Sequence, residues 1–189
     1  AFELSMRSIP CTVVDPRPVK LNSKQRRTLQ FRKQTRELLE AGSRISPLAR
    51  AMRNRYQNFK SGQVQSLVED FAESEEGERL LRECTVLVGM HPDEATDAIM
   101  DLAIQYRKPF AIVPCCVFPT RFAHRRIGGG NGDGNGDGNG DGKTVRSYDD
   151  LCEYIRHRVE GVQKATLGFE GRNTVFYWIP PEMVLLRNF

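Results

Sequence analysis

The sequence lacks any long hydrophobic run. Across its 189 residues, no apolar stretch approaches the roughly 20 residues that a helix needs to cross a bilayer. Residues 1–4 contain neither the basic leader nor the apolar segment of a signal peptide. The sequence therefore predicts no membrane-spanning segment, no membrane partner and no secretory signal.

Cysteines in metal-binding spacing are also missing. The five cysteines are an odd number, and none falls in a Cys-x-x-Cys or Cys/His zinc pattern, so we expect neither a disulfide scaffold nor a metal site. Cys115 and Cys116 are adjacent, and on a strand end their side chains would point to opposite faces, so they are not expected to chelate together. This usage is typical of a reducing, intracellular compartment, with the cytoplasm favoured and an organelle still open.

The charge is distributed unevenly, although the net charge is only +4. Residues 1–60 hold 14 Lys/Arg and 4 Asp/Glu, whereas residues 61–101 hold 2 and 11. A basic segment of this density attracts phosphates, which makes RNA a candidate partner, and a solvated helix face is the alternative. The candidate RNA-binding side chains here are Lys24, Arg26, Arg27, Arg32, Lys33 and Arg36, followed by Arg44, Arg50, Arg53 and Arg55.

A low-complexity segment interrupts the second half of the chain. Asn-Gly-Asp-Gly occurs three times between 131 and 142, and 9 of the 16 glycines lie in 128–142. Without apolar residues the segment cannot offset its ordering entropy by burial. We therefore expect a flexible insertion at 128–143 in a single domain of residues 1–189. Calcium-binding glycine-rich repeats need a periodic apolar residue, which this segment does not have.

Strands and helices alternate around this insertion. Apolar, β-branched runs predict strands at 11–14, 64–68, 85–88 and 110–113. Helical patterns cover 23–41, 47–59, 75–83, 96–106 and 148–159. The last apolar segments, 165–169 and 174–179, lie too close together for a crossover helix and should pair antiparallel. The pattern predicts a Rossmann-like α/β fold: a mostly parallel sheet with helices on both faces and a C-terminal antiparallel hairpin.

Polar residues follow the predicted strands, where open parallel sheets bind ligands. Asp15 can accept hydrogen bonds from both hydroxyls of a ribose, although Asp before Pro is equally a turn residue. His91 suits proton transfer near neutral pH, or a hydrogen bond within a turn. Asp93 has a sufficient explanation as a charge at a helix start. Cys115 and Cys116 are, by default, small buried thiols.

Three motifs at these strand ends resemble the class I S-adenosylmethionine-dependent methyltransferase fold. They are Val-Val-Asp-Pro-Arg at 13–17, Leu-Val-Gly-Met-His-Pro-Asp-Glu-Ala-Thr at 87–96, and Phe-Ala-Ile-Val-Pro-Cys-Cys-Val-Phe at 110–118. The Gly-x-His and Cys-Cys pair is similar to that of eukaryotic methyltransferase-like proteins, a group that includes tRNA ribose methyltransferases. The likeness covers most of residues 1–180, but the family's first strand and glycine-rich loop have no counterpart. It therefore implies an incomplete chain, a partner chain or another segment in that place, or lost cofactor binding.

The resemblance also implies roles for individual residues. S-adenosylmethionine would be bound through its ribose by Asp15 and through its adenine by Glu69 or Asp70 with Phe71. The methyl-transfer site would be edged by Gly89, Met90 and His91, with His91 as the proton acceptor. The candidate catalytic residues are His91, Asp93, Cys115 and Cys116. Arg121, Arg125 and Arg126 could extend the basic surface towards a tRNA or rRNA substrate.

Three functional hypotheses follow. The first is an S-adenosylmethionine-dependent methyltransferase acting on RNA, with a small-molecule or protein methyl acceptor still open. The alternative is a catalytically inactive, methyltransferase-like RNA-binding or ribonucleoprotein scaffold, which the missing glycine-rich loop favours. An NAD-dependent enzyme is a poorer match, because Val-Val-Asp suits NAD but the later motifs do not.

Overall fold

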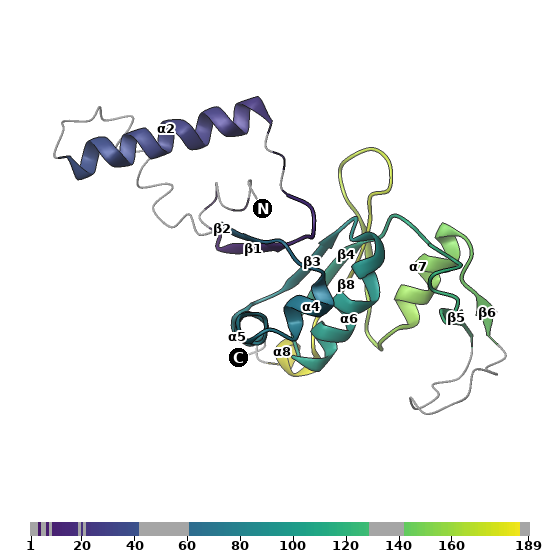
Figure 1. The fold of residues 1–189 in the computed structure, drawn as a ribbon. Coiled ribbons are helices and arrows are strands. Elements are labelled where there is room, and N and C mark those ends of the chain that lie inside the picture. The colour runs from purple at the N-terminus through teal and green to yellow at the C-terminus, as the bar shows by residue number, and fades with distance from the viewer. Residues whose placement is uncertain are drawn as a thin grey trace. The chain divides into compact units, whose positions relative to one another are not determined.

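The computed structural model describes residues 4, 7, 9–18, 20, 22–41, 61–128 and 142–185. The predicted helix at 47–59 and most of the predicted insertion at 128–143 lie outside these residues. The chain divides into two compact units, Ala1–Phe71 (unit 1) and Ala72–Phe189 (unit 2). Figure 1 shows the helices and strands of both units.

Unit 1 contains a two-stranded parallel sheet. β1 (Cys11–Val14), as predicted, pairs with β2 (Ser61–Val64), and Val14 lies opposite Val64. The predicted strand at 64–68 is wrong beyond Val64, because the chain turns into helix α4 (Val68–Ala72). The acidic residues in the first turn of α4 explain this change, since they stabilise the start of a helix and are unfavourable in a strand.

The long helix of unit 1, α2 (Ser23–Glu40), confirms the prediction for 23–41. It begins at a capping box. Asn22 Oδ1 accepts a hydrogen bond from the Gln25 backbone N–H, and Gln25 Oε1 accepts one from the Asn22 backbone N–H, both at 2.9 Å. Local sequence is thus sufficient to start this helix.

Unit 2 is built on a four-stranded sheet in the order β3-β4-β8-β7. The strands are β3 (Leu87–Met90), β4 (Phe110–Val113), β7 (Gln163–Thr166) and β8 (Thr174–Trp178). β3 and β4 are parallel, whereas β8 is antiparallel to both of its neighbours. The predicted C-terminal hairpin is confirmed, with Ala165 opposite Val175. Because its second strand joins β4, the sheet is mixed rather than mostly parallel.

Helices and a small hairpin complete unit 2. α5 (Glu75–Glu83), α6 (Thr96–Gln105) and α7 (Tyr148–His157) correspond to predicted helices. A 3-10 turn, η1 (Asp93–Ala95), precedes α6. The pairing of β5 (Arg126–Ile127) with β6 (Lys143–Thr144), and helix α8 (Pro181–Leu185), were not predicted. Strands β5 and β6 have two residues each, which is too short to produce a hydrophobic periodicity.

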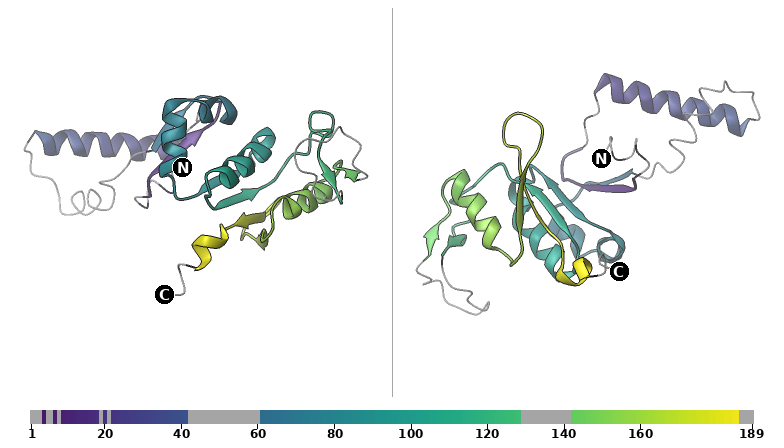
Figure 2. Two further views of the ribbon diagram at one scale, coloured as in Figure 1. Left: turned by 90° about the horizontal axis from the view of Figure 1, so that it is seen from below. Right: turned by 180° about the vertical axis from the view of Figure 1, so that it is seen from behind.

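The core of unit 2 lies between α6, α7 and one face of the sheet (Figure 2). Phe110 of β4 lies opposite Trp178 of β8, and Ile112 lies opposite Phe176, so these four side chains share that face. The helices contribute Ile99, Met100, Ala103, Leu151 and Ile155. The core thereby holds β4 rigidly at the centre of the sheet, with β3 beside it.

Candidate functional site at the ends of β3 and β4

The parallel strands β3 and β4 end side by side. Met90 lies opposite Val113, and the His91 backbone N–H donates a 3.0 Å hydrogen bond to the Val113 carbonyl oxygen. The residues that follow the two strands therefore meet at one edge of the sheet. The Cys115 thiol donates a 2.9 Å hydrogen bond to Asp93 Oδ1. The structure thus joins two segments that lie 22 residues apart in the sequence.

The turn after β3 has an unusual backbone. His91 and Asp93, on either side of Pro92, have φ angles of 51° and 50°, in the left-handed region that few residues other than glycine adopt. Gly89 is buried, and a Cβ there would lie 3.0 Å from both Ile99 Cδ1 and Pro92 Cγ. Gly89 therefore allows the turn to pack closely against α6. This turn carries His91 and Asp93 at the strand end.

Cys115 and Cys116 come together with Asp93. One donor atom from each of the three residues lies within 4.8 Å of the other two, and all three residues are half-buried. The expectation that the two cysteines point apart is wrong. It assumed the alternation of a strand, but β4 ends at Val113 and the backbone at 114–118 is irregular.

The surroundings of Cys115 favour its protonated thiol over the thiolate. Burial raises the pKa of Cys115 to about 12, and the hydrogen bond to Asp93 acts in the same direction. Since the thiolate is the reactive form of cysteine, this residue stays protonated while it is paired with Asp93. These two candidate catalytic residues therefore form a hydrogen-bonded thiol and carboxylate at the strand ends.

An aromatic residue that the sequence analysis did not select joins the site. The Phe169 ring lies edge-on to His91, with centroids 6.5 Å apart, and is 42% exposed. It belongs to the connection between β7 and β8, which extends beyond the strand ends (Figure 1). Asn173 Nδ2 donates hydrogen bonds to the carbonyl oxygens of Leu167 and Phe169 and closes this connection. No local signal marks Phe169, because its place follows from the long-range pairing of β8 with β4: β8 is antiparallel to β4 and so begins near the carboxyl end of β4.

The predicted cofactor residues of unit 1 have structural partners of their own. The Asp15 carboxylate accepts hydrogen bonds from the Arg17 backbone N–H at 2.8 Å and from Arg17 Nε at 3.0 Å. These bonds lower the pKa of Asp15, which is therefore ionised at neutral pH. Glu69 and Asp70 are exposed, whereas Phe71 is buried. A ribose at Asp15 would have to compete with Arg17.

The basic residues of α2 are on the surface where their side chains are described. Lys24, Arg26, Arg27 and Lys33 are all exposed. Lys33 lies 3.9 Å from Glu37, one helical turn away. Arg32 and Arg36 are on the same helix. Residues 44, 50, 53 and 55 lie outside the described residues. The helix thus presents positive charge to solvent.

Arg125 must be removed from the predicted RNA-binding residues. It is 1% exposed, and its Nε donates a 2.9 Å hydrogen bond to Asp97 Oδ2 in an ion pair. Its guanidinium also lies 3.8 Å from the centre of the Phe122 ring. Arg121 and Arg126 are exposed, and they contact Glu94 and Thr144, respectively. The segment before the insertion thus holds one structural arginine between two surface ones.

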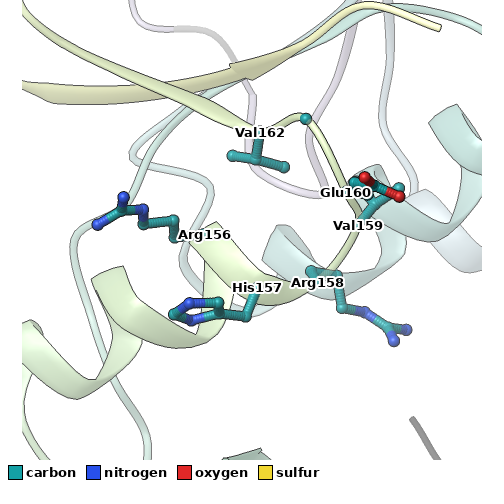
Figure 3. A pocket seen from close by; sticks show the side chains of 7 residues that line it. Arg156, His157, Arg158, Val159, Glu160 and Val162 are labelled. Atoms are coloured by element: carbon teal, nitrogen blue, oxygen red, sulfur yellow. The ribbon is translucent and has the colours of Figure 1, made fainter. Parts of the chain in front are cut away.

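A separate open hollow of about 700 Å³ follows the end of α7 (Figure 3). It is lined by residues 156–162, and none of the predicted site residues is among them. Arg158 is paired with Asp101 at 2.5 Å, and His157 Nδ1 lies 2.9 Å from the Glu153 carbonyl oxygen. Local pairing therefore explains these two polar side chains.

Comparison of the chain with family models, with curated proteins and with solved structures gave no match. Within the described part of the chain, no helix is both long and apolar enough to span a membrane.

Proposed function

We propose that this protein is an S-adenosylmethionine-dependent methyltransferase that acts on RNA. The observation that carries the proposal is the grouping of His91, Asp93, Cys115 and Phe169 at the carboxyl ends of β3 and β4. Ligands of parallel strand pairs bind at this edge of a sheet. A residue able to accept a proton, a fixed polar wall and an exposed aromatic ring meet there.

Each group has a role in this proposal. Methyl transfer to a ribose hydroxyl or a base nitrogen requires the acceptor to lie in line with the sulfonium methyl group and to lose a proton. His91 accepts that proton. Phe169, exposed beside His91, stacks against an unpaired base, a common mode of RNA recognition. The Cys115 thiol donates its hydrogen to Asp93, and this pairing favours direct transfer to RNA over a covalent cysteine intermediate.

The two remaining parts of the proposal rest on unit 1. The exposed lysines and arginines of α2 bind RNA phosphates, and Asp15 binds the cofactor ribose after its contact with Arg17 opens. We place the protein in a reducing intracellular compartment, the cytoplasm first, because all five of its cysteines are free.

A catalytically inactive RNA-binding scaffold is the second candidate. The engagement of Asp15 by Arg17 and the burial of Phe71 favour it, since both residues would otherwise be available to a cofactor. Such a scaffold binds RNA through α2 with an affinity that falls steeply as salt rises, and it binds no S-adenosylmethionine.

Calorimetric titration of S-adenosylmethionine into the longest native form of the protein separates the two. We expect binding that Asp15→Ala abolishes and that Glu37→Ala, an exposed acid on α2, leaves unchanged. His91→Ala should keep the cofactor affinity while methyl incorporation into RNA falls by about 10²–10⁴-fold. His157→Ala is the control for the imidazole.

Three results would contradict the proposal or one of its parts. A folded protein that binds no S-adenosylmethionine would favour the scaffold. Binding that Asp15→Ala leaves intact would place the cofactor elsewhere. Methyl incorporation that is insensitive to His91→Ala would remove the proposed proton acceptor.

A further inference from the structure

Asp93, Cys115 and Cys116 also form a compact group of potential metal ligands. Their donor atoms all lie within 4.8 Å of one another, and the Cys115 Sγ to Asp93 Oδ1 distance is 2.9 Å. The three residues come from two neighbouring strand ends that the β3–β4 ladder holds together. The group is therefore assembled by the fold and not by one flexible loop.

We propose that these three residues bind a zinc-type divalent cation. In a tetrahedral zinc site, the metal lies about 2.3 Å from sulfur and about 2.0–2.2 Å from oxygen, so neighbouring ligand atoms are about 3.5–3.8 Å apart. In the structure, the Cys115 Sγ to Asp93 Oδ1 distance of 2.9 Å is shorter than this spacing, and the upper limit of 4.8 Å on the separations of all three donor atoms is longer. A cation entering between Cys115 and Asp93 has to separate Sγ and Oδ1 by only about 0.6–0.7 Å, within the reach of small side-chain rotations.

The chemistry of the donors selects the cation. Two sulfur ligands and one carboxylate suit zinc, whereas calcium and magnesium are bound by oxygen ligands alone. On binding, both thiols lose their protons to solvent and two sulfur–metal bonds and one oxygen–metal bond form. The hydrogen bond between Cys115 and Asp93 is replaced by their shared contact with the metal.

The site has an open position. Three protein ligands leave the fourth coordination position of a tetrahedral ion to water or to a bound molecule, the arrangement of catalytic zinc sites. The three ligands are half-buried and not enclosed, so solvent can reach the metal. His91, two residues before Asp93, is the histidine nearest in sequence to the three proposed ligands.

Cobalt(II) is a suitable probe because thiolate ligands give it an intense charge-transfer absorption. We expect the reduced, full chain to bind one Co²⁺ with this absorption, and Zn²⁺ to displace it. Cys115→Ser, Cys116→Ser and Asp93→Asn should each weaken Co²⁺ binding by about tenfold or more, a loss at least as large as that for removing an outer-shell partner. Two control variants should bind Co²⁺ as the unmodified chain does. Cys84→Ser removes a half-buried thiol that is not part of the cluster, and Glu94→Gln neutralises the acidic residue next to Asp93.

Alkylation of the unmodified chain avoids any dependence on how the variants fold. At alkaline pH and with excess reagent, where the metal-free thiols react, Zn²⁺ should slow the alkylation of Cys115 and Cys116, and it should leave the equally half-buried Cys84 and Cys152 as reactive as before. Mass spectrometry of the peptides distinguishes them. A folded, reduced chain without the charge-transfer absorption would overturn the proposal, as would equal protection of all four thiols or equal weakening by Cys84→Ser.

Discussion

Units 1 and 2 differ in how they bury apolar side chains. In unit 2, α6, α7, β4 and β8 share one cluster in which Met100, Ile112 and Leu151 are fully inaccessible to solvent. Among the described residues of unit 1, Phe71 is the only buried apolar side chain, and Phe31 and Leu38 of α2 are about half exposed. A rigid framework carries the strand-end residues, whereas a surface helix carries the positive charge. Reactive groups need a rigid framework to hold them in place, whereas a surface helix is enough to attract phosphates.

The largest expected effect is on the core of unit 2. Phe110 is 1% exposed and stacks on Trp178 with ring centroids 5.9 Å apart. Phe110→Ala should lower the free energy of unfolding by about 3–5 kcal/mol, because it removes buried contacts and leaves a cavity. Leu38→Ala, an apolar truncation in α2, should change it by no more than about 0.5 kcal/mol. Urea denaturation measures both, and a comparable loss in Leu38→Ala would show that α2 is covered in solution.

A buried ion pair offers the next test. Arg125 pairs with Asp97, and within the part of the chain that is described Arg125 Nη2 and Asp97 Oδ1 are buried without a hydrogen-bond partner. Arg125→Met should cost about 3–5 kcal/mol of unfolding free energy, because it removes the buried guanidinium that pairs with Asp97 and leaves only the exposed His124, 3.8 Å away, beside that carboxylate. Arg121→Met, on the exposed neighbour, should cost less than about 1 kcal/mol.

A second substitution decides why Arg125 matters. If the isolated charge is the cause, the double variant Arg125→Met with Asp97→Leu should recover most of the lost stability. An additive loss in the double variant would assign the effect to packing of the guanidinium on Phe122 instead.

Elements with a clear period and a local stop could be predicted from sequence. The hydrophobic periodicity of α6 and the capping of α2 depend on residues that are close in the sequence. Both helices were predicted to within a residue or two. Leu87–Met90 was expected two residues earlier, because Thr85 and Val86 are as β-branched as a strand requires. The ladder with β4, a long-range contact, fixes where that strand begins.

The candidate site was predictable in place but not in detail. The parallel pairing of β3 and β4 follows from the strand–helix–strand order, and it brings Asp93 and Cys115 together. Irregular backbone after Val113, which no periodicity describes, decides that Cys115 and Cys116 converge. Arg125 looked like its exposed neighbours in sequence, since only tertiary packing against Phe122 and Asp97 distinguishes it.

The smallest effects concern two capping boxes, one in each unit. Ser147 and Asp150 cap α7 reciprocally, as Asn22 and Gln25 cap α2. Ser147→Ala should lower the unfolding free energy of unit 2 by about 1 kcal/mol, because α7 is part of its core. Asn22→Ala should reduce the helical circular dichroism signal slightly, because α2 loses its cap, and it should not shift the unfolding transition of unit 2. A shift of the main transition by Asn22→Ala would join α2 to the cooperative core.

Acid sharpens the difference between these boxes. Hydrogen bonds from Lys143 and from the backbone of Arg146 and Ser147 lower the pKa of Asp150. Its stabilising contribution is therefore complete above the ordinary carboxyl pKa of about 3.9 and is lost as pH falls below that value. The difference in stability between the unmodified chain and Asp150→Asn should accordingly shrink in acid. Gln25 carries an amide, which does not titrate, so the effect of Gln25→Ala on α2 should be the same in acid and at neutral pH.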